Sequence, residues 1–190
     1  MDGVQLRSAL VESAITVVND KGLVGTTTKA ICEKAHCNEV YIYRLFGSKE
    51  GLLQQTFTHL DKELANCLNY YLRNLNDENA RVDFDKVFNG VWNYLLEKRE
   101  KCSFLIRYYH SVLFDDYLPL KRQETYKATI EKFRVLLKDG SDPWWLLNQT
   151  YDVLFNTLGR ILRKEEQDEA GAKERLSNLL YYIWIPHIKV

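Results

Sequence analysis

Apolar residues recur at spacings of three and four along almost the whole chain, and this periodicity constrains the fold more than any other feature. Such spacing places apolar side chains along one stripe of an α-helix, whereas a β-strand needs alternation with a period of two. That alternation is almost absent, and only 3 Pro and 9 Gly interrupt the 190 residues, too few for a turn-rich β fold. The sequence therefore predicts an all-α fold.

Residues typical of helix ends divide the chain into about nine expected helices. Gly22 and Gly47 stand at expected helix ends, while Asn38, Ser48 and the threonines at 26–28, whose hydroxyls suit an N-cap, stand at expected starts. The expected helices span about 5–21, a short stretch from the threonines at 26–28 to Ala35, then 39–46, 48–75, 84–99, 101–113, 120–138, 143–164 and 172–185.

The long helix expected at 48–75 is the connection between two domains. No flexible linker rich in Pro, Gly or Ser interrupts the chain around it. We therefore expect this helix to join an N-terminal domain at 1–50 rigidly to a C-terminal helical bundle at 51–190.

Charge and hydropathy narrow the class of protein. The 26 Lys and Arg residues balance 26 Asp and Glu residues, so a polybasic protein that coats DNA and an acidic tail are both disfavoured. No apolar run approaches the roughly 18 residues that a membrane helix needs, and the first ten residues lack the apolar core of a secretory signal. We expect a soluble cytoplasmic protein without a membrane partner.

Four cysteines stand at 32, 37, 67 and 102, and only Cys32 and Cys37 are close in sequence. Reduced thiols are favoured over disulfides in a chain without an export signal. A zinc site would need a fourth ligand beside Cys32, His36 and Cys37, and none follows nearby. We therefore expect neither a metal site nor a cofactor.

The first 50 residues predict a helix-turn-helix, because three short helices follow one another with a tight turn between the second and the third. In this motif the third helix is supported by the other two, and its N-terminal residues enter the major groove of DNA. Ile42 and Phe46 are expected to face the core, while Tyr43 and Lys49 are placed to hold phosphates. Within 26–49, four basic residues stand against Glu33 and Glu39, a net charge of +2 that is small for a DNA-binding surface.

Residues 10–52 resemble the DNA-binding domain of the TetR family of transcriptional regulators. The most specific part of the family signature, Y-x2-F-x-S-K-E-x-L, is present in register at 43–52. The other matching residues are Gly22, Thr26, Thr27, Ile31, Ala35, Asn38 and Ile42. The departures from the family pattern are Cys32 for Ala, His36 for Gly, Cys37 for Val, Val40 for Gly and Tyr41 for Thr.

The resemblance implies which residues meet double-stranded DNA. The positions that contact DNA in the family correspond to Thr27, Thr28, Lys29, Asn38, Glu39, Val40, Tyr41, Tyr43, Arg44 and Lys49. Among them, Glu39 and Tyr41 are the expected base readers, because a glutamate can accept a hydrogen bond from cytosine N4. The resemblance also implies a regulator, most often a repressor, that is associated with the nucleoid when it is bound to DNA.

In the C-terminal bundle, the last two helices have broad apolar faces, and the family dimerises through such helices. The resemblance therefore implies a homodimer on a pseudopalindromic site, with an interface formed by Tyr151, Leu154, Phe155, Leu158, Leu162, Leu176, Leu180, Ile183 and Trp184. The alternative is that these residues pack only within one chain.

The middle of the chain holds many aromatic residues with polar groups between them. In the family a small-molecule effector binds among the middle helices, and the residues expected to contact it are Asn89, Trp92, Phe104, Arg107, Tyr108 and His110. The alternative is that the rings fill the core and that the polar groups lie at the surface.

Enzymatic motifs are missing from the sequence: it contains no G-x-S-x-G, no Gly-rich phosphate loop and no H-E-x-x-H. We therefore expect no enzyme. The competing hypothesis to a DNA-binding regulator is a helical protein-interaction module that has the TetR shape without sequence-specific DNA binding.

Overall fold

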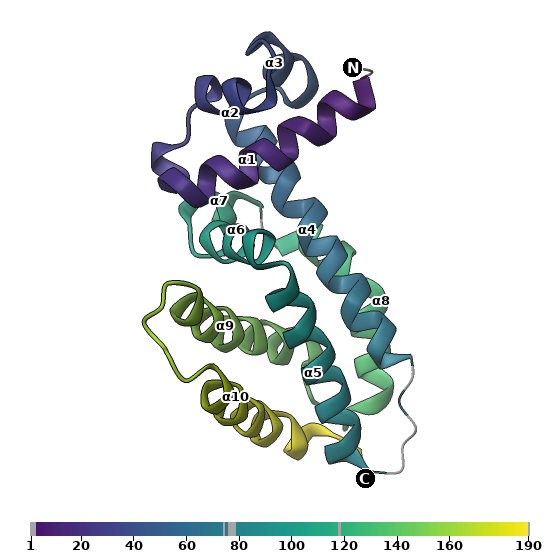
Figure 1. Ribbon diagram of the computed structural model, residues 1–190. Coiled ribbons are helices and arrows are strands. Elements are labelled where there is room, and N and C mark those ends of the chain that lie inside the picture. Colours follow the sequence, from purple (N-terminus) through teal and green to yellow (C-terminus); the bar gives the residue numbers. More distant parts are fainter. Residues whose placement is uncertain (1–2, 74, 76–78, 118, 190) are drawn as a thin grey trace. The chain divides into compact units, whose positions relative to one another are not determined.

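The computed structural model describes residues 3–73, 75, 79–117 and 119–189. These residues form ten α-helices and a short 3-10 turn, and no strand is found among them (Figure 1). The elements are α1 Gly3–Gly25, α2 Thr28–Ala35, α3 Val40–Phe46, α4 Lys49–Leu72, α5 Ala80–Glu97, α6 Arg99–Tyr109, α7 Val112–Tyr117, α8 Pro119–Leu136, α9 Pro143–Leu162, α10 Glu169–Trp184 and η1 Ile185–His187. The expected all-α fold is confirmed.

The expected helix at 101–113 is wrong in its C-terminal part, where the structure ends α6 and begins α7. The break lies at Ser111, whose hydroxyl donates to the Tyr108 carbonyl at 2.7 Å. The Ser111 N–H also donates to that carbonyl, at 3.1 Å, and a serine that bonds to nearby backbone in this way competes with a continuing helix. The helix count therefore rises by one above the expected nine.

The described chain divides into two compact units, Met1–Lys62 with Lys98–Arg122, and Glu63–Glu97 with Gln123–Val190. The expected domains, 1–50 and 51–190, stay a prediction. The helix α4 contributes to the first unit up to Lys62 and to the second unit from Glu63 onward.

The core of the first unit is built from the apolar stripe of α1 and the inner faces of α2, α3, α4 and α6. Leu10, Ile31 and Ile42 are fully buried in it. The ring of Phe57 on α4 stacks on Tyr108 of α6, with the ring centroids 4.7 Å apart. Burial of a large side chain such as these contributes roughly 1.5–3 kcal/mol to the stability of the unit.

The core of the second unit lies among α5, α8, α9 and α10, and α9 and α10 lie side by side (Figure 1). The helix α9 begins with Pro143, and the carboxylate of Asp142 accepts hydrogen bonds from the next two backbone N–H groups at 2.9 and 3.1 Å. On α5, a Cβ atom at Gly90 would overlap the Tyr71 ring. Glycine at this position therefore allows α5 to lie against the end of α4.

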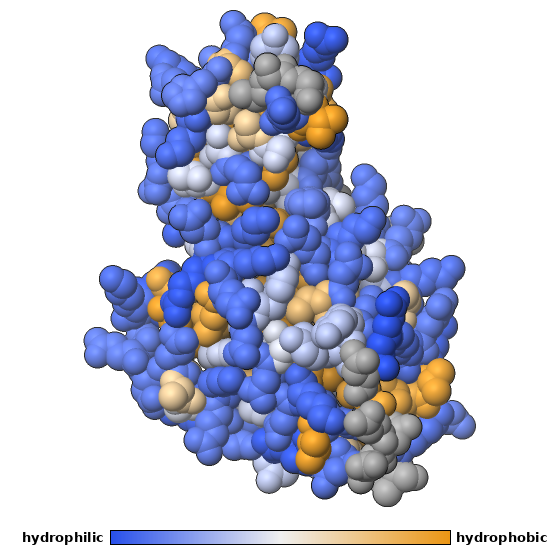
Figure 2. Space-filling model, turned by 45° about the vertical axis from the view of Figure 1, so that its right-hand side comes forward, coloured by the Kyte–Doolittle hydropathy of each residue, from blue (hydrophilic) through white to orange (hydrophobic). Residues whose placement is uncertain are grey.

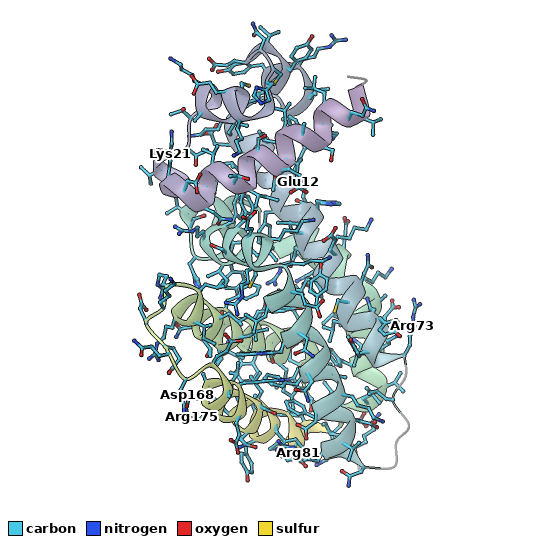
Figure 3. The ribbon with its side chains drawn as sticks, viewed as in Figure 1. Glu12, Lys21, Arg73, Arg81, Asp168 and Arg175 are labelled. Atoms are coloured by element: carbon cyan, nitrogen blue, oxygen red, sulfur yellow. The ribbon has the colours of Figure 1, made fainter. Side chains whose placement is uncertain are left out.

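The start of α10 is fixed by a cluster of charged side chains that Figure 3 labels. Asp168 accepts a hydrogen bond from the Gly171 N–H at 2.8 Å, and Arg175 Nη1 lies 3.4 Å from Asp168 Oδ2 (Figure 3).

On the face shown in Figure 2, hydrophilic side chains predominate and the hydrophobic ones form small separate groups. No helix in the described ranges has both the length and the apolar content needed to cross a membrane.

Candidate nucleic-acid interface

The turn that leads into α2 is fixed by threonine hydroxyls. The Thr26 hydroxyl donates to the carbonyl of Gly22 at 2.7 Å, and Gly22 itself has a φ of 72°, which interrupts the helix as expected. The Thr27 hydroxyl accepts a hydrogen bond from the Ala30 N–H at 3.1 Å and so caps α2. The run of threonines thus performs the capping role that its composition predicts.

The helix α2 ends in a left-handed residue, His36, with φ 53° and ψ 46°. The His36 N–H donates to the carbonyl of Glu33 at 3.4 Å, and the Cys37 N–H donates to the carbonyl of Cys32 at 3.0 Å. This pair of hydrogen bonds is the Schellman motif, which satisfies the last carbonyls of a helix. A histidine therefore makes the tight turn that the family pattern makes with glycine.

The recognition helix of the motif is α3, and its first turn is capped by Asn38. The Asn38 Oδ1 accepts a hydrogen bond from the Val40 N–H at 2.9 Å, which confirms Asn38 as the capping residue. Ile42 and Phe46 are buried, as predicted, and Gly47 ends the helix with a φ of 80°.

The outward face of α3 carries large side chains. Val40 is 64 % exposed, Tyr41 38 % and Tyr43 57 %, and Asn38 and Arg44 are exposed beside them. All ten residues that the resemblance assigns to DNA contact lie in or directly before α2, α3 and the first turn of α4, in the first unit.

Contacts within the motif hold the side chains of Thr28, Glu39 and Lys49. The Thr28 hydroxyl donates to the carboxylate of Glu39, so each holds the other in place. Lys49 Nζ donates to the carbonyl of Thr26 at 3.1 Å and lies 3.5 Å from Glu50 Oε1. The backbone N–H of Glu50 and then the Lys49 ammonium lower the pKa of the Glu50 carboxyl.

Arg7 on α1 also belongs to this motif, although no sequence pattern indicated it. Its Nη1 donates to the carbonyl of Leu45 at 3.2 Å, and its guanidinium lies 4.5 Å from the centroid of the Phe46 ring. A second nitrogen bonds to Gln55 on α4. Because these partners lie 38 to 48 positions away in sequence, no local pattern signals the role of Arg7.

The residues expected to contact an effector lie in different units. Asn89 and Trp92 belong to the second unit, with Asn89 exposed and Trp92 buried. The other four belong to the first unit: Phe104 and Tyr108 are buried in its core, and Arg107 and His110 are exposed. The structure does not bring the six together in either unit.

The second unit instead contains a cavity of about 450 Å³. Its walls are mostly apolar side chains from α4, α5, α8, α9 and α10, including Leu68, Leu72, Phe84, Phe88, Phe133, Leu154 and Leu180. None of the six expected effector residues is among the described residues that line it. The aromatic run of α5 was visible in the sequence, but the periodicity alone did not show which rings border a space.

Three of the polar side chains that line the cavity have partners within the protein. Asp83 Oδ1 lies 3.3 Å from Lys86 Nζ, and the Thr150 hydroxyl accepts from Trp184 Nε1 at 2.8 Å. Lys189 Nζ donates to the carbonyl of Val135 at 3.1 Å. The cavity therefore offers a mostly apolar surface to a ligand.

The residues expected at a dimer interface are largely buried within one chain. Leu162 and Ile183 are half-buried, and the other seven are buried among α9, α10 and their neighbours: Tyr151, Leu154, Phe155, Leu158, Leu176, Leu180 and Trp184. Their broad apolar faces fill the core of the second unit and border its cavity. Trp145, Leu179 and Tyr182 are the large apolar side chains that α9 and α10 expose.

Comparison with known proteins supports the resemblance found in the sequence. Residues 10–56 match the family of bacterial regulatory proteins named tetR. The chain is 23 % identical over 139 residues to the "Probable HTH-type transcriptional regulator YttP" of Bacillus subtilis, and 29 % identical over 58 residues to the HTH-type transcriptional regulator BetI of Paraburkholderia phymatum. The first match covers 72 % of this chain and 65 % of YttP, and the second covers 30 % of each protein.

The fold agrees with the same family along nearly the whole chain. A TetR family transcription regulator from Marinobacter aquaeolei VT8 superposes with a TM-score of 0.73 at 16 % sequence identity. The superposition covers 98 % of this chain and 97 % of the other. The architecture is therefore that of TetR-family regulators, with an N-terminal helix-turn-helix and a helical C-terminal part.

Proposed function

We propose that this chain, with its tetR-type N-terminal domain, is a transcriptional regulator that binds double-stranded DNA as a homodimer. The observation that carries the proposal is the outward-facing helix α3, which Asn38 caps and which exposes Val40, Tyr41 and Tyr43. A recognition helix contacts base edges in the major groove through its N-terminal residues. By the family resemblance the regulator is a repressor that acts in the cytoplasm and at the nucleoid.

Base reading is assigned to Tyr41, and phosphate contacts to Tyr43 and Arg44. The carboxylate of Glu39 is held by Thr28, so it reads a cytosine only in the orientation that this hydrogen bond allows. Lys49 is tied to the Thr26 carbonyl, so its contribution to DNA binding includes holding the start of α2 in place.

The dimer is proposed to form through the outward faces of α9 and α10. The exposed side chains of Trp145, Leu179 and Tyr182 are the apolar groups available there, since most residues first assigned to the interface are buried. Two-fold symmetry would present two α3 helices to half-sites about one helical turn, roughly 34–36 Å, or a little more apart.

The effector is proposed to be an apolar small molecule that occupies the cavity of the second unit. Leu68 and Leu72, at the end of α4, border this cavity, while the first turn of the same helix contributes to the helix-turn-helix. An effector that binds more tightly to a conformer unable to engage DNA would release the operator by shifting the population of conformers.

A selection of genomic DNA fragments by the purified protein, at low and at moderate salt, tests the function. We expect a pseudopalindromic sequence that survives moderate salt, and we expect Tyr41→Ala to change the selected half-site. Tyr70→Ala, which removes an exposed tyrosine from the second unit, is the matched control and should select the same sequence as the original protein. Binding that is salt-sensitive and unselective at both concentrations would favour the protein-interaction module instead.

A further inference from the structure

Cys32 and Cys37 form a close pair that the proposed function leaves unused. They flank the left-handed residue His36, four residues before it and one after it, at the two positions of the Schellman motif whose side chains frequently make contact across the turn. The Cys37 N–H donates to the Cys32 carbonyl at 3.0 Å, which brings the two residues together across the turn. The two positions that usually make the apolar contact of this motif are here both cysteines.

The two thiols differ in how far they are exposed. Cys32 is buried beneath the end of α2, whereas Cys37 is half-buried. Burial, followed by the hydrogen bond with Cys37, raises the pKa of the Cys32 thiol to about 12. A small oxidant in solution therefore meets Cys37 first, and Cys32 lies beside it as the second sulfur.

We propose that Cys32 and Cys37 are a reversible redox pair, which hydroperoxides oxidise to a disulfide across the turn that leads into the recognition helix. The site is one of chemical modification, and its substrate class is the hydroperoxides, including hydrogen peroxide. The formation of the disulfide does not depend on the proposed function, whereas its effect on DNA binding does.

The reaction balances with one hydroperoxide for each disulfide. The Cys37 sulfur attacks a peroxide oxygen, the O–O bond breaks, and the thiol proton passes to the departing oxygen, which leaves as an alcohol or as water. The Cys32 sulfur then attacks the sulfur of the resulting sulfenic acid, the S–O bond breaks, and a second water leaves with the Cys32 proton. The two sulfurs lose two electrons to the peroxide, and a small dithiol reverses the reaction.

Closing the disulfide moves the start of α3. A disulfide requires the two sulfurs to approach to about 2.05 Å, closer than two thiols in contact. Cys37 directly precedes Asn38, whose side chain caps α3, so the approach displaces the cap relative to α2. Because α2 and α3 both contribute DNA contacts, we expect the oxidised protein to bind its selected DNA about tenfold more weakly or worse.

The experiment treats the purified full-length protein with hydrogen peroxide and maps the remaining thiols by alkylation and peptide mass. We expect a single bond between Cys32 and Cys37, with the loss of two hydrogens and full recovery by dithiothreitol. Cys37→Ser removes the half-buried partner and should make both the thiol map and the DNA affinity insensitive to peroxide. Cys67→Ser is the matched control on α4 and should behave like the original protein.

Three results would overturn the proposal. Oxidation of Cys37 to sulfinic acid, with no bond to Cys32, would exclude the redox pair. A disulfide between Cys37 and Cys67 would also exclude it. A complete Cys32–Cys37 disulfide that leaves DNA affinity unchanged would exclude the coupling to α3. A reduced protein that selects no DNA sequence would count against the proposed function alone, because the thiol map is read without DNA. Cys32→Ala, which introduces the small residue that the family has at this position, removes the other cysteine of the pair. This variant should likewise form no disulfide across the turn.

Discussion

Arg122 Nε lies 3.2 Å from Asp61 Oδ2, and the two side chains are 1 % and 0 % exposed. This buried ion pair joins the first residues of α8 to α4 within the first unit. The Arg122 guanidinium also lies 5.3 Å from the centroid of the Tyr109 ring and 5.6 Å from that of Phe114. The charge of Arg122 is thus placed among a carboxylate and two aromatic rings, out of contact with water.

Asp61→Asn should lower the free energy of unfolding by about 3–5 kcal/mol, because it removes a negative charge that lies against the buried guanidinium. Urea unfolding followed by circular dichroism measures this change. Glu165→Gln, in an exposed pair with Arg163, is the control and should leave stability nearly unchanged. A cost of Asp61→Asn no larger than that of the control would show that the pair adds little to stability. The double variant Asp61→Leu with Arg122→Met should recover part of the lost stability.

Asn38→Ala should cost about 1 kcal/mol of stability, because it removes the cap of α3. The frayed first turn should also weaken DNA binding, since it carries Val40 and Tyr41. Thermal unfolding and DNA titration measure the two effects. Asn89→Ala, at an exposed position inside α5, is the control for loss of an asparagine. This variant should keep the stability and the DNA affinity of the original protein. Equal effects of the two variants would remove the capping role from Asn38.

His36→Gly should raise the stability by about 0.5–1 kcal/mol. A left-handed conformation costs a residue with a side chain roughly 1–2 kcal/mol, and the greater freedom of glycine in the unfolded chain offsets part of this gain. His36→Ala keeps the strain and should show no gain. If both variants destabilise the protein, then the His36 side chain itself contributes to the turn.

Tyr41→Ala and Lys49→Ala should differ in their effects on DNA binding. We expect the tyrosine variant to lose about 1–3 kcal/mol of binding free energy on the selected DNA sequence and to relax the base preference at one position of that sequence. The lysine variant should bind all sequences more weakly, and it should also unfold more easily, because the Thr26 carbonyl loses a charged hydrogen-bond donor. Titrations on the selected and on scrambled DNA, at several salt concentrations, compare the two. A uniform loss of affinity in both variants would contradict these roles.

Val87→Trp should fill part of the cavity of the second unit without unfolding the protein. Val87 is half-buried and lines the cavity, so the indole would occupy space that an apolar ligand needs. Binding of an apolar fluorescent dye, followed by titration, should be lost in this variant. Val82→Trp, at an exposed position of the same helix outside the cavity, should leave dye binding intact. Equal dye binding by both variants would place the dye elsewhere.

Local patterns in the sequence predicted the helix-turn-helix closely. The capping roles of Thr27, Asn38 and Ser48 and the burial of Ile42 and Phe46 follow from short-range rules on hydrogen-bonding side chains and helical spacing. Such rules depend only on residues within a few positions of each other, so the sequence alone is enough to apply them.

Contacts between distant parts of the chain were beyond these rules. The pairing of Asp61 with Arg122 joins residues 61 positions apart, and the contacts of Arg7 reach across 38 and 48 positions. The apolar faces of α9 and α10 were visible, but periodicity reports how wide an apolar face is and not what covers it. The structure shows that the core of the same unit covers most of Tyr151, Leu158 and Leu176.

The cavity in the second unit has a consequence for how this protein would discriminate among guest molecules. Its wall is mostly apolar, and Asp83, Thr150 and Lys189 are already engaged with other groups, so a ligand gains mainly from apolar contacts. In such a cavity the affinity for a ligand depends on its size and shape, and each buried methylene contributes about 0.8 kcal/mol of binding free energy. Affinity would rise along a homologous series until the space is full and then fall. Under the proposed function, the protein would respond to a range of apolar compounds of similar size.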